Sequence, residues 1–335
     1  MLPGEYHLEA KMQNSKIDVA VLLIFFCREK QFKAVFDQVK KARPSRLYLY
    51  QDGAREGRES DKTGIAACRK IAEDIDWDCE VHTWYQEKNV GCDPSEFLAQ
   101  KWMFETETKG IIIEDDDVPS QSFFPYCKEL LDRYENDERV GMICGMNNTG
   151  VSEHIKSSYF YSLNGSIWGW ATWRRVVDTW DEHYRWLEDE VTVKNLRQKF
   201  YNQEAYEGFL TTARMHKASG RAHYESIHGA AVYLNGQYNI VPKYNMISNI
   251  GVGEETTHSV SDIRFLPKDA RKLINMKRYE IEFPLVHPNY VLKDMQFEKQ
   301  VTGSRKKRWK MRIESVMLRV RYGDFKYIFK KIIGK

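Results

Sequence analysis

Hydrophobic and polar positions follow two alternating periods along the first 145 residues. Ile17–Phe26 is a nearly continuous apolar run, which predicts a buried strand, and apolar residues then recur at helical spacing from Phe32 to Val39. The alternation continues, with strands expected at 46–50, 79–85, 110–114 and 140–145 and helices at 31–42, 65–75, 95–107 and 122–134. Strands that alternate with helices predict an α/β fold with a mainly parallel, Rossmann-like sheet covered by helices on both faces.

The second half of the chain is less regular. Residues 157–162 predict a strand, residues 168–181 an aromatic-rich helix, and residues 193–219 a mostly helical segment. Asn235-Gly236 separates two short apolar runs, 231–234 and 238–241, which is a typical signal of a β-hairpin.

Four consecutive acids follow the strand expected at 110–114. Three isoleucines lead into Glu114, Asp115, Asp116 and Asp117. Acids concentrated at the end of a buried strand repel one another, so a cation, protons or basic neighbours must relieve the charge. Ligands bind beyond the carboxyl ends of parallel strands, and oxygen ligands suit Mn²⁺ or Mg²⁺. We therefore expect a divalent cation at this edge; the alternative is a solvated acidic turn.

Composition excludes several classes of protein. The chain has 335 residues, of which 42% are hydrophobic and 30% charged, so collagen-like and mostly disordered chains are excluded. The longest apolar run, Val19–Phe26, is too short to span a bilayer, and Met1–Lys16 lacks the pattern of a signal peptide. Six scattered cysteines without a CxxC pair indicate a reducing compartment, and argue against a disulfide framework or a zinc site.

The charge of the chain is concentrated at its end. Residues 301–335 contain 12 Lys and Arg against two acids, a net charge of +10, which leaves 39 basic against 46 acidic residues, or −7, in the rest. Apolar residues recur at helical spacing from Ile313 to Ile332, which is typical of a helix on an anionic membrane surface. A helix packed on the acidic body is the alternative. No nucleic-acid partner is expected, since phosphate binding needs no apolar stripe.

Several short segments sharpen the expectation for the acidic strand end because they occur in a fixed order. They are Phe25-Phe26-Cys27-Arg28, residues 47–53 (LYLYQDG), 87–92 (EKNVGC), 114–116 (EDD), 167–174 (IWGWATWR) and 245–258 (NMISNIGVGEETTH). As an ordered set they resemble the bacterial nucleotide-diphospho-sugar transferases of GT-A fold, some of them labelled hemolysin-like. That family is similar to the N-acetylglucosaminyltransferase I group, glycosyltransferase family 13. The resemblance covers roughly residues 17–262.

The resemblance implies roles for the residues at the strand ends. Arg28 would contact the nucleotide diphosphate, Asp52 would hold the uracil, Glu114 and Asp115 would face the ribose and the donor, and Asp116 would ligate the metal. Asp117 stands where relatives usually carry a non-acidic residue. Taken alone, Arg28 could simply start a helix, although an anion partner suits a cation at a helix N-terminus better. Asp52 alone could be a turn residue.

The loop from Gly251 to His258 would, by the same resemblance, close over the diphosphate. Thr257 and His258 would then be donor-binding residues. An imidazole can ligate Mn²⁺ when neutral or pair with phosphate when protonated, and a purely structural histidine is the alternative.

An aromatic group and one carboxylate are the candidates for the acceptor side. Trp168, Trp170 and Trp173 offer ring faces that could stack on a sugar, although aromatic residues at such spacing are more often core and at least one should be buried. Relatives carry a catalytic carboxylate, often in a Trp-Asp pair, in a later helix. This chain lacks the pair, and Glu225 is the nearest carboxylate, so Glu225 is the candidate base; a salt-bridged surface glutamate is the alternative.

The expected organisation is an N-terminal extension (1–16), a nucleotide-sugar-binding half (17–150), an acceptor-binding half (151–270), a connecting segment (271–302) and a basic amphipathic tail (303–335). The expected function is a metal-dependent, inverting glycosyltransferase that moves a sugar from a UDP-sugar to a glycan or lipid-linked acceptor. It would be cytoplasmic and peripheral to the inner face of the membrane. The alternatives are a nucleotidyltransferase, disfavoured because no Gly-rich loop follows the first strand, and a non-catalytic sugar- or membrane-binding protein.

Overall fold

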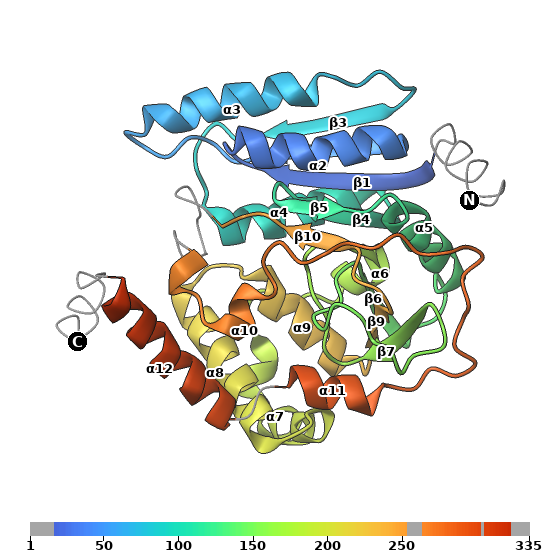
Figure 1. Ribbon diagram of the computed structural model, residues 1–335, viewed down its shortest axis with the longest axis vertical. Helices are drawn as coiled ribbons and strands as arrows, with labels where there is room; N and C mark the ends of the chain where they lie inside the picture. The colour runs from blue at the N-terminus through green and yellow to red at the C-terminus, as the bar shows by residue number, and fades with distance from the viewer. Residues whose placement is uncertain (1–16, 253–262, 303–304, 323–335) are drawn as a thin grey trace.

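A computed structural model describes residues 17–252, 263–302 and 305–322 (Figure 1). The expected N-terminal extension at 1–16 lies outside the described residues, as does the end of the tail at 323–335. The strands of the first half are β1 (Ile17–Phe25), β2 (Pro44–Gln51), β3 (Glu80–Tyr85), β4 (Lys109–Glu114), β5 (Asp117–Pro119) and β6 (Val140–Cys144). The helices between them are α2 (Glu29–Ala42), α3 (Glu59–Ala72), α4 (Cys92–Thr106) and α5 (Phe123–Arg133). The strands and helices expected up to residue 145 are confirmed, with shifted ends.

The second half adds four strands and a larger number of helices to the same body. Its strands are β7 (Tyr159–Ser162), β8 (Trp170–Trp173), β9 (Tyr238–Pro242) and β10 (Ile247–Asn249). Its helices are α6 (Arg174–Val177), α7 (Glu190–Leu196), α8 (Gln203–Ser219), α9 (Tyr224–Leu234), α10 (Lys268–Arg271), α11 (Met295–Val301) and α12 (Arg305–Arg321), with 3-10 turns at η1 (Arg185–Glu188), η2 (Arg197–Lys199) and η3 (Ile263–Phe265).

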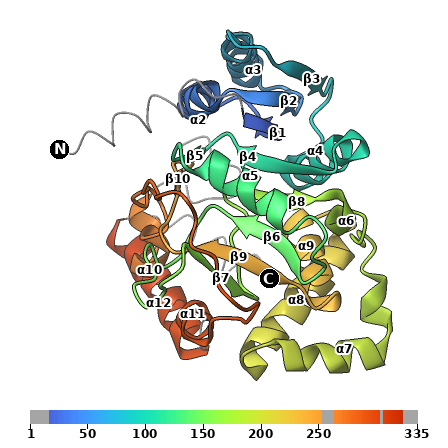
Figure 2. The same ribbon diagram turned by 90° about the vertical axis from the view of Figure 1, so that its right-hand side faces the viewer.

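One eight-stranded sheet runs through both halves, in the order β3-β2-β1-β4-β8-β6-β9-β7. Strands β3, β2, β1 and β4 are parallel, and so are β6 and β9, whereas β8 and β7 run antiparallel to their neighbours. The expectation of a mainly parallel α/β sheet flanked by helices is therefore confirmed. Because β8 from the second half lies between β4 and β6 from the first, residues 17–150 and 151–270 share a single sheet (Figure 2).

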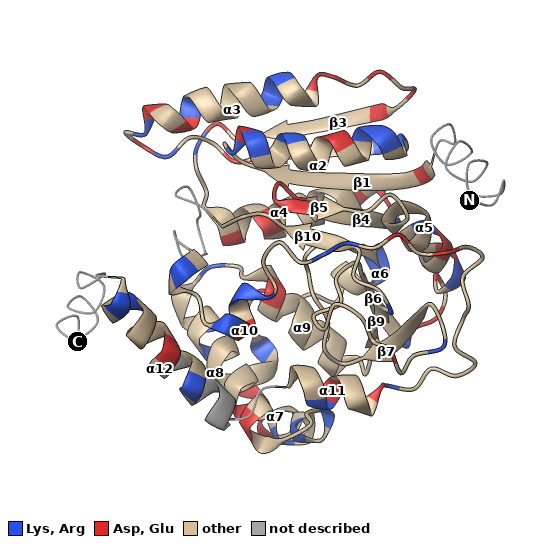
Figure 3. Cartoon of the chain, viewed as in Figure 1, with Lys and Arg blue, Asp and Glu red and all other residues tan. Residues whose placement is uncertain are grey.

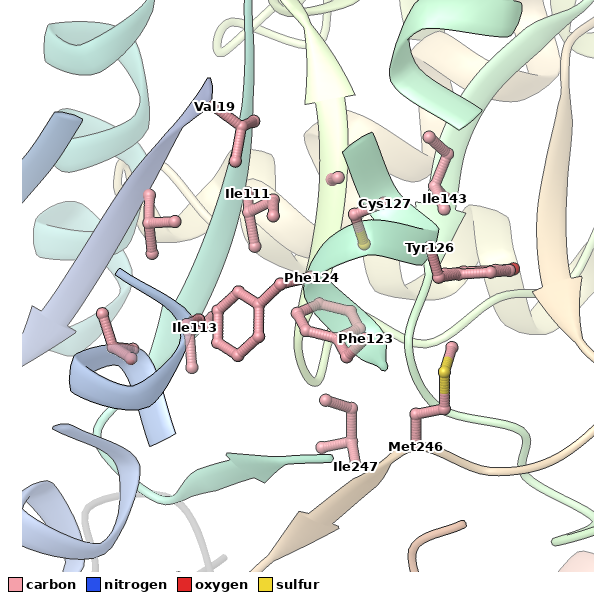
Figure 4. Close-up of a cluster of buried hydrophobic side chains, with 14 of the residues drawn as sticks. Val19, Ile111, Ile113, Phe123, Phe124, Tyr126, Cys127, Ile143, Met246 and Ile247 are labelled. Carbon is pink, nitrogen blue, oxygen red and sulfur yellow. The ribbon is translucent and has the colours of Figure 1, made fainter. Parts of the chain in front are cut away.

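Each face of the sheet carries its own hydrophobic core. One core combines alternate residues of the strands with α2 and α5, and Figure 4 shows part of it around Ile111, Phe123 and Phe124. The other core lies under α4, α8 and α9 and contains Trp170, Tyr224 and Ile227. Successive strand residues point to opposite faces, so a strand buried on both sides reads as a continuous apolar run. This is why Ile17–Phe26 was recognisable from the sequence.

Two expectations about the second half are wrong. Residues 168–181 are not mainly helical, because Trp170–Trp173 forms β8 and the helix that follows, α6, has four residues. The pairing with β4 and β6 imposes the strand, which aromatic residues favour in any case. The hairpin expected around Asn235-Gly236 is also absent from this described segment, since the run 231–234 is the last turn of α9 and only 238–242 is a strand. A short apolar run does not by itself distinguish a helix end from a strand.

The basic tail begins as a helix at the edge of the molecule. Figure 1 shows α12 at the lower left edge of the molecule, and in Figure 2 it lies on the side of α10 and α11. Its Lys and Arg residues are blue in Figure 3. Glu314 of α12 accepts a hydrogen bond from the backbone N–H of Lys268 in α10 at 2.9 Å. The guanidinium of Arg319, which is buried, lies over the ring of Phe265 at 5.1 Å. Of the helices in the described ranges, none is long and apolar enough to cross a membrane.

Candidate functional site

The parallel strands β2, β1 and β4 bring their carboxyl ends together at one edge of the sheet. Asp52 follows β2, Arg28 lies between β1 and α2, and Glu114 ends β4 with Asp115 directly behind it. All four residues line a cavity of about 100 Å³, which we call the edge cavity. Its lining is completed by Ile24, Phe25, Phe26, Arg55, Asn89, Gly91, Cys92, Ser95 and Glu96. Its volume is below the roughly 300–1,000 Å³ of most small-molecule sites.

Arg28 is the basic neighbour that relieves part of the acidic charge. Its guanidinium pairs with the carboxylate of Asp115 and, at 2.8 Å, with Oδ2 of Asp116. Asp115 also accepts a hydrogen bond from the backbone N–H of Phe26 at 3.2 Å. Burial works against the charge of Arg28, yet the two aspartates outweigh it and raise the pKa of Arg28. Asp116 itself is buried, and burial raises its pKa although Arg28 acts in the opposite direction.

Asp117 is held on the side of the acidic segment away from Arg28. It is fully buried at the start of β5, and the side-chain amide of Asn249 in β10 donates to Oδ1 of both Asp116 and Asp117 at 3.0 Å. Its second oxygen, Oδ2, is buried without a hydrogen-bond partner among the described residues. Burial, followed by the charge of Asp116, raises the pKa of Asp117 well above its ordinary value.

The backbone at Gly251 passes close to the side chains of Asp116 and Arg28. A Cβ atom there would lie 1.9 Å from Oδ2 of Asp116, so any other residue would displace the carboxylate. Glycine is therefore required at position 251 by the close approach of the chain.

The donor set of this edge fits a divalent cation. One carboxylate oxygen each from Glu114, Asp116 and Asp117 lie within 4.8 Å of one another. Mg²⁺ and Mn²⁺ prefer oxygen ligands, and all three donors here are carboxylate oxygens. Among the described residues, Oδ2 of Asp117 is buried without a hydrogen-bond partner and could serve as such a ligand. The negative charge of the acidic segment is therefore reduced in two ways, by pairing with Arg28 and by carboxyl groups that retain protons. Its oxygens also fit a third way, which is the binding of a divalent cation.

Glu114 and Glu96 are acids of the edge cavity that stay protonated more readily than usual. Burial, followed by the charge of Asp116, raises the pKa of Glu114 to about 8, and the Tyr224 hydroxyl donates to its Oε1 at 3.1 Å. Burial raises the pKa of Glu96 well above its ordinary value, and the charges of Glu114 and Glu225 add to the effect. Glu114 can therefore keep its proton at neutral pH and donate a hydrogen bond.

Asp52 is anchored by the loop that precedes α4. It accepts hydrogen bonds from the backbone N–H groups of Gly53, Val90 and Gly91 at 2.8–3.0 Å and from the Asn89 side chain at 2.7 Å. Burial raises its pKa, and these donors offset part of the rise. Asp52 therefore fixes the segment 87–92 against the end of β2, and residues of both segments, LYLYQDG and EKNVGC, line one cavity.

The three tryptophans singled out for the acceptor side do not share a surface. Trp170 is 0% and Trp173 2% exposed, on opposite faces of β8 and in different cores. Trp173 donates its indole N–H to the carbonyl of Leu131 at 3.0 Å. Neither ring offers a face to a sugar, so the expectation for these two is corrected: a central strand of a sheet covered on both sides buries both faces. Trp168 remains partly exposed.

Glu225 lies in the first turn of α9, close to an ion pair. His223 Nδ1 is 3.0 Å from Oδ1 of Asp93, and ligand atoms of Asp93, His223 and Glu225 lie within 4.8 Å of one another. The neighbouring residue, Tyr224, reaches Glu114 in the edge cavity. The fold therefore brings the candidate base to the side of the edge cavity, whereas Thr257 and His258 lie outside the described residues.

Sequence reasoning missed Asn249, Glu96, Tyr224 and the Asp93–His223 pair. Asn249 lies within the segment 245–258, whose resemblance directed attention to its later residues. The contact of Tyr224 with Glu114 spans 110 positions in the sequence. No local pattern marks such a pair, because it depends on where α9 docks.

Comparisons with known proteins show no family and weak structural similarities. No family model matches the chain, and no curated protein matches it. Among solved structures it is similar to an apo UDP-glucose pyrophosphorylase, with 7% identity, a TM-score of 0.33, and coverage of 69% of this chain and 93% of that one. A UDP-glucose pyrophosphorylase complexed with UDP-glucose has 8% identity, a TM-score of 0.30 and coverage of 48% and 78%. A protein described as a glucose-1-phosphate thymidylyltransferase from Bacillus anthracis, in complex with sucrose, has 12% identity, a TM-score of 0.26 and coverage of 48% and 73%. These neighbours are enzymes of nucleotide-sugar chemistry, and at such identities and TM-scores the likeness carries no argument about this chain's reaction.

Proposed function

We propose that this protein is a metal-dependent glycosyltransferase that moves a sugar from a UDP-sugar to a hydroxyl group of a glycan or lipid-linked acceptor, with inversion. The observation that supports the proposal is the placement of Arg28, Glu114 and Asp115 around the edge cavity, at the carboxyl ends of adjacent parallel strands. Asp116 is paired with Arg28 and lies outside the cavity lining, so its role as metal ligand requires that this ion pair opens. Ligands of open α/β sheets bind at this edge.

The donor diphosphate would be bound by Arg28. A guanidinium makes the same kind of charge-assisted contact with phosphate as with carboxylate. Arg28 would then exchange its contacts with Asp115 and Asp116 for contacts with the diphosphate. Asp116, with Glu114 and Asp117 beside it, would hold Mn²⁺ or Mg²⁺, which stabilises negative charge on a diphosphate leaving group. Asp52 and its loop would border the uracil, and Glu114 and Asp115 the ribose.

Glu225 would act as the general base. Its carboxylate takes the proton of the acceptor hydroxyl while that oxygen forms a bond to the anomeric carbon from the side opposite the diphosphate. The bond between the anomeric carbon and the diphosphate oxygen breaks, and UDP leaves with the electron pair. A Glu225→Gln variant should then bind the donor normally and lose transfer.

Donor binding can be tested with the full chain by thermal shift. UDP and UDP-sugars should raise the melting temperature only when Mn²⁺ or Mg²⁺ is present, since a ligand that binds the folded state stabilises it. Asp116→Asn should abolish this shift, whereas Asp37→Asn, on the exposed surface of α2, should leave it intact. A thermal shift of the same size without the metal, or in Asp116→Asn, contradicts the assignment of Asp116 as a ligand of the metal.

Two readouts separate the proposal from its alternatives. A nucleotidyltransferase would release pyrophosphate from UTP in the presence of a sugar 1-phosphate, whereas a glycosyltransferase releases UDP from a UDP-sugar. A non-catalytic binding protein would do neither, and its ligand binding would be unchanged in Asp116→Asn.

We also propose that α12 attaches the enzyme to an anionic membrane surface. Trp309, Ile313, Val316, Met317 and Val320 are 38–67% exposed and follow one another at helical spacing, so they form one outward apolar face, the α12 stripe. The charge of +10 over residues 301–335 complements anionic lipid, at about 1 kcal/mol for each basic residue at the surface.

Vesicle sedimentation tests the attachment. The chain should bind vesicles that contain phosphatidylglycerol and not pure phosphatidylcholine vesicles. Met317→Ser with Val320→Ser should weaken binding at least tenfold, while Met295→Ser, an exposed methionine of α11, should not. Equal binding by all three proteins refutes the role of α12.

A further inference from the structure

A second and larger hollow lies on the helical side of the molecule. It has a volume of about 1000 Å³ and is bounded by α8, α9 and Trp309 of α12; we call it the α8–α9 groove. Figure 1 shows α8 between α9 and α12. The lining residues are Ala205, Gly208, Phe209, Thr211, Thr212, His216, Glu225, Ser226, Gly229, Tyr233 and Trp309.

The lining of the groove combines aromatic rings with hydroxyl groups. Phe209 and Tyr233 pack edge-to-face at 5.3 Å, and threonine and serine hydroxyls lie along the same walls. Aromatic faces pack on the C–H faces of sugars, while hydroxyl groups match the hydrogen-bonding groups of their rims. The Thr211 hydroxyl already donates to the carbonyl of Glu207, and the Ser226 hydroxyl is hydrogen-bonded to Tyr184 and His216. The features of the groove that suit a carbohydrate are therefore its aromatic rings and the carboxylate of Glu225.

One end of the groove adjoins the edge cavity. Glu225 lines the groove, and the preceding residue, Tyr224, donates to Glu114 of the edge cavity at 3.1 Å. On the same side, His223 contacts Asp93, which follows Cys92 of the cavity lining. The first turn of α9 is therefore the wall between the two hollows, and Glu225 is the carboxylate on the groove side of it.

The other end of the groove adjoins the α12 stripe. Trp309 is both a lining residue and the first member of the stripe, and it is 67% exposed. Lys310 and Arg321 on the same helix are exposed as well. The groove thus extends from the candidate base, Glu225, to the α12 stripe and its basic residues. The first side suits the polar part of an amphiphile, and the second suits its apolar part.

We infer that the α8–α9 groove binds the acceptor, and that this acceptor is a glycolipid whose sugar reaches Glu225 while its lipid leaves the groove along Trp309 and the α12 stripe. The inference rests on the proposed function for the meaning of Glu225, and it adds the class of the acceptor and the place where it binds. Attachment of α12 to the membrane would bring the opening of the groove next to the lipid surface, where a lipid-linked acceptor is located.

The groove can be filled without disturbing the fold. A Cβ atom added at Gly229 would meet no atom within 4 Å, so a leucine there would extend into the groove. Leucine also has a higher helix propensity than glycine. Gly229→Leu should therefore stay folded, and Met215→Phe, which enlarges an exposed side chain of α8 outside the groove lining, is the matched control.

The test measures binding of n-dodecyl maltoside, below the concentration at which it forms micelles, by isothermal titration. Binding should be at least tenfold weaker in Gly229→Leu and unchanged in Met215→Phe, and maltose should bind at least tenfold more weakly than its dodecyl glycoside. Equal binding to Gly229→Leu and the unmodified chain, no binding of the glycoside, or equal affinity for maltose overturns the inference.

The same variants separate this inference from the proposed function. Gly229→Leu should keep the metal-dependent thermal shift with UDP, because Gly229 does not line the edge cavity. Glycoside binding that depends on Gly229, in a chain that shows no UDP shift, would refute the glycosyltransferase and retain the glycolipid site. A normal UDP shift, together with glycoside binding that is unchanged in Gly229→Leu, would retain the glycosyltransferase and refute the glycolipid site.

Discussion

Replacing Glu114 by glutamine should stabilise the protein at alkaline pH and change its stability little near pH 5. The folded protein raises the pKa of Glu114 from 4.5 to about 8 through burial and the charge of Asp116. A carboxyl group whose pKa is higher in the folded state favours folding fully below pH 4.5. This contribution is lost as the pH rises through 8. Glutamine does not ionise, and its side-chain oxygen can still accept the Tyr224 hydroxyl hydrogen bond.

The size of the effect follows from the two pKa values. Each pH unit between them is worth about 1.4 kcal/mol, so ionisation of Glu114 would cost up to roughly 5 kcal/mol of folding free energy. Glu114 is half-buried and borders the edge cavity, where water screens its charge. We therefore expect Glu114→Gln to gain about 2 kcal/mol at pH 9, about 1.4 kcal/mol at pH 7, and a few tenths at pH 5.

Urea denaturation at pH 5, 7 and 9, in the presence of a chelator, measures these differences. Acids remote from Glu114 titrate alike in both proteins and cancel in the comparison. The charge of Glu114 raises the pKa of Glu96 and Asp117, so both ionise more readily in Glu114→Gln and add to its gain at pH 9. Glu87→Gln, at an exposed position, is the control. The difference between its unfolding free energy and that of the unmodified chain should be the same at all three pH values. A difference between Glu114→Gln and the unmodified chain that stays constant from pH 5 to pH 9, or that favours the unmodified chain at pH 9, would refute the electrostatic account of the edge cavity.

Three further predictions concern stability at neutral pH. Asn249→Ala removes the amide that serves two buried carboxylates and should cost about 2–4 kcal/mol in urea denaturation, a loss that should shrink at pH 5. Trp170→Ala should cost about 3–5 kcal/mol because it empties a core position, whereas Trp168→Ala should cost less than half as much; equal losses would contradict the burial of β8. Glu298→Ala leaves three donors unpaired, two of them buried, and should cost about 3 kcal/mol. Amide hydrogen exchange at Leu163 should accelerate in that variant, and unchanged exchange would count against the hydrogen bond.

The local pattern of the sequence determined the first half of the fold and the location of the acids. Strands buried on both faces read as apolar runs, and helices covered on one face read as stripes of period 3.6, because burial follows the backbone repeat. The strand before Glu114 and the helix after Arg28 were predictable for this reason, and so was the meeting of these residues at one sheet edge, since parallel strands end together.

Only the tertiary structure decided how the acids are balanced and what lies beside them. Arg28 reaches Asp116 across 88 positions and Asn249 reaches it across 133, distances at which no periodicity links two residues. The insertion of β8 between β4 and β6 likewise turned an expected helix into a central strand and buried Trp170 and Trp173. Such contacts depend on the path of the whole chain, because the free energy of pairing a buried charge or filling a sheet position is gained only after distant segments have met.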